Sequence, residues 1–153
     1  MQALLALTLG AGLYPREAWS VSTGDLIELH GCLCVRASGK HPRIVPITAP
    51  HDETLRRIAA ADPGSTLLGM DPSSWTRSRL DRITQRVALP ADCPRIVTHR
   101  LRSTWVRVHL EHQVDLGGLA RMAAVTSGKF FENVIPYLRP VADDELFATM
   151  ARQ

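Results

Sequence analysis

Three groups of side chains, far apart along the chain, are of the types that act on phosphate esters. Lys40 lies in a run of turn residues, where a lysine can approach a ligand and deliver a proton. His99 and Arg102 are three residues apart, so a helix places them on one face, where one can move a proton and the other can stabilise phosphate oxygens. Tyr137 can act as a nucleophile if cations surround it. Each group alone also has an ordinary explanation. Lys40 could lie in a simple surface turn, His99 and Arg102 on a solvated helix face, and Tyr137 could be a packed tyrosine.

Arginine is concentrated in the middle of the chain. The 153 residues contain 18 Lys and Arg against 15 Asp and Glu, which gives a net charge of +3. The segment from Arg77 to Arg107 holds eight arginines and two aspartates, a net charge of +6. Because arginine binds phosphate through a bidentate fork, this pattern predicts a phosphate-binding face, although a solvated helix face explains it equally well. The predicted phosphate contacts are Arg43, Arg77, Arg79 and Arg100.

The composition excludes several classes of protein. With 45% hydrophobic and 22% charged residues, the chain can bury a core. Its three cysteines, Cys32, Cys34 and Cys93, are too few and too scattered for a disulfide scaffold and indicate a reducing, cytoplasmic environment. No apolar run reaches about 18 residues, so we expect no membrane-spanning helix. The chain has no zinc, P-loop or dinucleotide motif, so we expect neither a metal nor a cofactor.

The order of helical and strand-like patterns predicts an α+β fold that is mainly helical. Three short strands are expected at Leu26–Leu29, Cys32–Arg36 and Arg43–Ile47, joined by tight turns into a small antiparallel sheet near the N-terminus. About six to seven helices are expected to pack with this sheet. The helical patterns cover Gln2–Leu9, Pro15–Val21, His51–Ala61, Asp71 to about Val87, Thr98–His112, Leu116–Ala124, Gly128–Tyr137 and Asp143–Arg152.

In this order the motifs resemble the catalytic domain of the tyrosine recombinases, the phage-integrase family. Leu9–Ala18 is similar to the first box of the family, T-G-x-R-x-x-E within an apolar turn. Asp25–Ile47 is similar to its β-hairpin with the lysine, and His99–Trp105 to its H-x-L-R-H-T-F box. Tyr137 falls near the place of the family's nucleophile, so the resemblance covers essentially the whole chain.

The resemblance implies strand transfer on double-stranded DNA without a metal or an external energy source. In that reaction a tyrosine attacks a phosphodiester to form a 3′-phosphotyrosyl link, fixed cations stabilise the phosphoryl oxygens, and the lysine protonates the leaving 5′ oxygen. Carried over by position, Tyr137 is the nucleophile, Lys40 the general acid, His99 an acid–base residue and Arg102 a phosphate-binding arginine. Arg16 is the nearest candidate for the other phosphate-binding arginine.

The resemblance also implies how the chain is organised. Residues 1–153 would form a single catalytic domain, without the core-binding domain that precedes it in the family. Residues 141–153 would be an exchange helix that docks on a neighbouring subunit, so that copies assemble on DNA.

Three positions depart from the family pattern, and one of them is Ser103, which follows Arg102 where the family usually has a His. Tyr14 stands where the first catalytic arginine is expected, and Gly128 where a late His or Trp is expected. Losing one cation directed at a developing oxyanion costs roughly 10²–10³ in rate. Three alternatives therefore stay open: an active recombinase, a catalytically inactive relative that binds DNA or a protein partner, and a structural domain that binds only protein.

Overall fold

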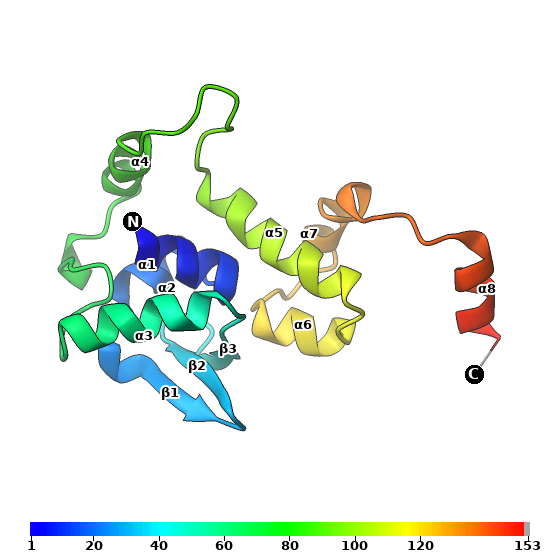
Figure 1. Cartoon of the computed structure of the whole chain (residues 1–153), viewed down its shortest axis with the longest axis horizontal. Helices are drawn as coiled ribbons and strands as arrows, with labels where there is room; N and C mark the ends of the chain where they lie inside the picture. The colour runs from blue at the N-terminus through cyan, green and yellow to red at the C-terminus, as the bar shows by residue number, and fades with distance from the viewer. Residues whose placement is uncertain (152–153) are drawn as a thin grey trace.

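The computed structural model describes residues 1–151, which form a set of helices with a small sheet at one edge (Figure 1). The helices are α1 (Gln2–Leu5), α2 (Pro15–Ser20), α3 (His51–Ala61), α4 (Arg77–Gln85), α5 (Thr98–Glu111), α6 (Leu116–Met122), α7 (Lys129–Glu132) and α8 (Asp143–Met150). A π-helical turn, η1 (Ala6–Gly10), continues α1. This architecture confirms the predicted α+β fold.

The sheet contains three antiparallel strands in the order β1 (Leu26–Leu29), β2 (Cys32–Ala37) and β3 (Arg43–Pro46). In β2 the side chains of Leu33, Val35 and Ala37 are buried, while Arg36 is exposed. The β1–β2 turn is two residues long, with φ of +50° and +78°, the conformation that hairpin turns of this length require. The β2–β3 turn is longer and carries Lys40.

The core forms where η1 meets α3 and α5. Leu7 of η1, Leu55 of α3 and Val106 of α5 are fully buried. Trp105 of α5 donates a hydrogen bond from its Nε1 to the carbonyl oxygen of Gly10, at 3.2 Å. The indole therefore fixes α5 against the chain segment that leads into α2.

Two predicted helices differ from the structure. The helix expected from Asp71 begins at Arg77, because Asp71 caps a short 3₁₀ turn and Thr76 then caps α4, where its hydroxyl accepts from the amide of Arg79 at 3.1 Å. The helix expected over Gly128–Tyr137 is divided into α7 and a 3₁₀ turn, η4 (Ile135–Tyr137). Pro136 explains this break, because proline lacks an amide hydrogen and its ring clashes with the preceding turn of a helix.

The C-terminal helix α8 stands apart from the other elements (Figure 1). Every residue from Val141 to Met150 is exposed. Arg152, the end of the predicted terminal helix, and Gln153, the end of the predicted exchange segment, lie outside the described residues. Within residues 1–151, no helix combines the length and the apolar character needed to cross a bilayer.

Gly12 should be intolerant of any side chain. Its φ is +58°, and a Cβ added there would lie 2.3 Å from Cε3 of Trp105. Gly12→Ala should therefore lower the free energy of unfolding by about 2–4 kcal/mol, through backbone strain and overpacking together.

Gly31→Ala is the matched control for this prediction. Gly31 also has a positive φ, +78°, but a Cβ there would meet nothing within 4 Å. Urea unfolding of both variants separates the clash from the strain, and equal losses of stability would contradict the tight contact with Trp105.

Candidate functional site

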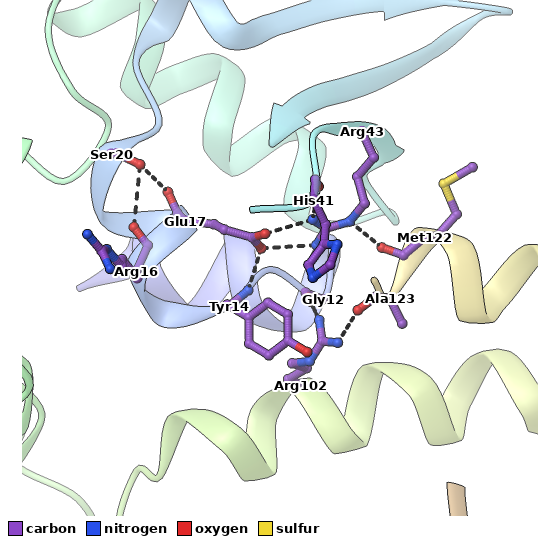
Figure 2. Close-up of polar contacts among 10 residues, drawn as sticks. All are labelled: Gly12, Tyr14, Arg16, Glu17, Ser20, His41, Arg43, Arg102, Met122 and Ala123. Carbon is purple, nitrogen blue, oxygen red and sulfur yellow. Dashed lines mark hydrogen bonds and ion pairs between the residues drawn. The ribbon is translucent and has the colours of Figure 1, made fainter. Parts of the chain in front are cut away.

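The buried guanidinium of Arg102 lies at the centre of the candidate site. Arg102 is on α5 and is only 2% exposed. Its Nη1 and Nη2 donate hydrogen bonds to the carbonyl oxygens of Gly12 and Ala123 (Figure 2). Burial lowers the pKa of Arg102 below its ordinary value, but an arginine this basic stays charged. No salt bridge of Arg102 is found among residues 1–151, so main-chain dipoles solvate its charge.

The aromatic ring of Tyr14 covers this guanidinium. The ring centroid lies 3.8 Å from Cζ of Arg102, a cation–π contact, and the ring of Phe130 lies 5.5 Å from the same atom. Figure 2 shows the Tyr14 ring against Arg102, at the start of α2. Tyr14, which stands where the resemblance expects an arginine, thus contacts Arg102.

A buried ion pair holds the start of α2 in place. Arg43 of β3 and Glu17 of α2 form a bidentate pair, with N–O distances of 2.7 and 3.0 Å. Glu17 also accepts from the amide of Tyr14 at 2.8 Å, and Nε of Arg43 donates to the carbonyl oxygen of Met122 at 2.7 Å. The side chains of Arg43 and Glu17 are 7% and 10% exposed.

Arg43, which the sequence predicted as a DNA contact, has its partners within the chain. Its guanidinium is already engaged by a carboxylate and by main-chain carbonyls, and it lies inside the fold. The other predicted phosphate contacts, Arg77, Arg79 and Arg100, are exposed.

The predicted catalytic residues line two different cavities, which are neighbours. The first, about 700 Å³, is called the Tyr137 cavity here and is lined by His99, Arg102 and Tyr137 among others. The second, about 970 Å³, is called the Lys40 cavity and is lined by Arg16 and Lys40 among others. Tyr14 and Pro15 line both cavities, and this shared boundary is called the Tyr14–Pro15 wall.

The positions of Tyr137, Arg16 and Gly128 agree with this assignment of residues to the two cavities. Tyr137 ends the η4 turn at the Tyr137 cavity, and 70% of its surface is exposed. Arg16 is exposed on α2, and Figure 2 shows it pointing away from Arg102. Gly128 precedes α7 and brings no side chain to either cavity. Within residues 1–151, no group of three His, Cys, Asp or Glu side chains is placed to hold a metal ion.

Sequence reasoning missed the partners of Arg102. The carbonyl groups of Gly12 and Ala123 carry no signal in the sequence, because every residue has one. The position of Tyr14 did carry a signal, since it departs from the arginine of the first box, but its contact with Arg102 needed the structure.

Solved structures of recombinases share this fold. The Tn1549 transposon integrase in complex with circular intermediate DNA is 16% identical, with a TM-score of 0.60 over 97% of this chain and 56% of that chain. The XerH site-specific recombinase bound to its difH substrate is 18% identical, with a TM-score of 0.61 over 97% and 45%. The XerA recombinase is 17% identical, with a TM-score of 0.65 over 98% and 56%.

These likenesses show a fold like that of the tyrosine-recombinase catalytic domain, as the sequence motifs predicted. The chain spans about half the length of these three proteins. A scan against protein-family models and a search of curated proteins give no match.

Breaking the buried ion pair should destabilise the fold. Glu17→Gln removes the charge that compensates Arg43 and should cost about 3 kcal/mol of unfolding free energy. The control is Glu28→Gln, which removes the same charge from the exposed pair between Glu28 and Arg56. Exposed pairs contribute little, so thermal unfolding of the control should match the unmodified protein. Similar losses in both variants would contradict a structural role specific to Glu17.

Proposed function

We propose that this chain is a recombinase-like domain that binds double-stranded DNA but does not cleave it. The observation that carries the proposal is that the guanidinium of Arg102 already has partners within the chain. Its two terminal nitrogens are held by main-chain carbonyls, and the ring of Tyr14 lies over its face. A guanidinium in this state is not free to form a bidentate clamp on a phosphate.

Strand cleavage by the family's route requires several groups around one phosphate. The tyrosine oxygen forms a bond to phosphorus while the bond to the 5′ oxygen breaks, and that oxygen takes up a proton. Cations must meet the non-bridging oxygens as charge develops on them. Here the first cation is replaced by Tyr14, the second is covered, and Lys40 lies across the Tyr14–Pro15 wall from Tyr137.

Binding does not depend on the groups that cleavage requires. Arg77, Arg79 and Arg100 are exposed, and no salt bridge among residues 1–151 involves them. Exposed cations neutralise phosphates without regard to sequence. The likeness to an integrase and a recombinase that are bound to DNA supports the same partner for this chain.

One observation favours the alternative of an active recombinase. Tyr137 is highly exposed and lines the same cavity as His99 and Arg102. If the Tyr14 ring leaves Arg102 when DNA binds, nucleophile, histidine and arginine would face one phosphate. The experiment below separates the two functions.

The proposal predicts binding without a covalent adduct. On nicked duplexes of randomised sequence, binding should weaken steeply between low and moderate salt, since counterions are released on association. Under denaturing conditions, the unmodified protein should retain no more DNA than Tyr137→Phe. An adduct that disappears in Tyr137→Phe would establish the active enzyme instead, and binding that does not respond to salt would remove the DNA partner.

We also propose that α8 docks on a second copy of the chain when both are bound to DNA. Every residue of α8 is exposed, and Leu146, Phe147 and Met150 form an apolar stripe at 44%, 67% and 65% exposure. Apolar side chains gathered on an isolated helix favour a partner surface. A second copy is the partner that the recombinase-like fold supports.

Phe147→Asp should abolish this assembly, because it places a charge in the apolar stripe. Sedimentation of DNA complexes should then give one protein per duplex, where the unmodified protein gives two or more. Ala148→Asp is the control, since Ala148 is exposed on the opposite side of the same helix. A single copy per duplex with the unmodified protein, or equal loss in both variants, would contradict docking through this stripe.

A further inference from the structure

The Lys40 cavity brings together cations from three separate segments. Arg16 comes from α2, Lys40 from the β2–β3 turn and Arg77 from the first turn of α4. All three side chains are exposed, and no salt bridge within residues 1–151 involves them. The fold therefore collects three uncompensated positive charges in one hollow.

The only carboxylate among the lining residues of this cavity is already neutralised. Glu17 lines the cavity, but its two oxygens are bound by the guanidinium of Arg43. Ser38 and Thr98 add hydroxyl groups to the lining, and no hydrogen bond of either side chain is found among the described residues. Cations together with free hydroxyl donors match the chemistry of a phosphate group, which accepts hydrogen bonds on every oxygen.

We infer that the Lys40 cavity is a second phosphate-binding pocket, which holds a DNA backbone phosphate across the Tyr14–Pro15 wall from the Tyr137 cavity. The identity of the ligand as DNA rests on the proposed function.

The arrangement of the two cavities favours a backbone over a free anion. Arg100 lines the Tyr137 cavity, so cations line the cavities on both sides of the Tyr14–Pro15 wall. Along a DNA strand one phosphate follows another about every 3.4 Å of helix axis. A single strand that crosses Tyr14 and Pro15 can thus present one phosphate to each side, whereas a free anion would use one cavity alone.

The inference gives Lys40 a role in binding. In this pocket its ammonium group is a point charge for a phosphate. Lys40 is not among the residues that line the Tyr137 cavity. Arg16 and Arg77 contribute to the same site, which explains why Arg16 points away from Arg102.

The test compares two double variants that lose the same charge. Lys40→Gln/Arg77→Gln removes two cations of the pocket, and Arg56→Gln/Arg57→Gln removes two exposed arginines of α3 that line neither cavity. Affinity for a duplex is measured over a range of salt concentrations. The pocket variant should bind at least about tenfold more weakly, and the slope of log affinity against log salt should fall by about 0.9 for one lost phosphate. The α3 variant should match the unmodified protein.

A pocket variant with an unchanged slope, in a protein that binds DNA, would overturn the pocket and leave the proposed function intact. Failure of the unmodified protein to bind DNA would overturn the proposed function and the DNA ligand together. Inorganic phosphate then tests the pocket separately: shifts of the amide signals of Gly39 and Lys40 that are lost in the pocket variant would keep it as a site for a free phosphate. Unshifted signals would overturn it.

Discussion

The structure depends on one buried charge. Arg102 cannot be taken out of water without compensation, because an unpaired guanidinium in the interior costs several kcal/mol. Here the carbonyl oxygens of Gly12 and Ala123 provide that compensation. Because those oxygens belong to the loop before α2 and to the end of α6, a single side chain on α5 joins three segments that are distant in the sequence.

The need to compensate the buried charge of Arg102 also determines how the neighbouring residues are arranged. The loop that offers the Gly12 carbonyl also delivers Tyr14 to the face of the guanidinium. The amide of Tyr14 is held by Glu17, which Arg43 neutralises while it also binds the carbonyl of Met122. Since Met122 and Ala123 are adjacent, Arg43 and Arg102 bind neighbouring carbonyls from opposite sides. The two arginines thus act together in the fold, and neither is presented to solvent.

This arrangement agrees with the proposed binding of DNA without cleavage. An arginine that binds main-chain carbonyls stabilises the protein whether or not a phosphate is present. At the position where the resemblance expects a second cation, Tyr14 places an aromatic face against Arg102. An aromatic face at that position stabilises the buried guanidinium, where a like charge would repel it.

Local patterns predicted the elements well and their contacts poorly. The strands were predicted to within one residue at each end, because alternation and turn residues are encoded locally. The helix over Gly128–Tyr137 was wrong because the prediction gave Pro136 too little weight. Arg43 was predicted as a phosphate contact because the sequence does not show that Glu17, 26 residues earlier, lies beside it. The grouping of Lys40, His99, Arg102 and Tyr137 followed from order along the chain, and only the structure showed the wall that Tyr14 and Pro15 place among them.

The most direct test of this account follows Arg102 itself. Its Nε carries a buried hydrogen without a partner among the described residues, so its ¹H–¹⁵N signal should be observable and can be assigned by its loss in Arg102→Lys. If Arg102 stays hydrogen-bonded to the two carbonyls, its Nε signal will not shift when duplex DNA is added. The amide signals of the exposed arginines will shift. A shift of the Arg102 signal at stoichiometric DNA would show that a phosphate reaches the guanidinium, and would contradict the account.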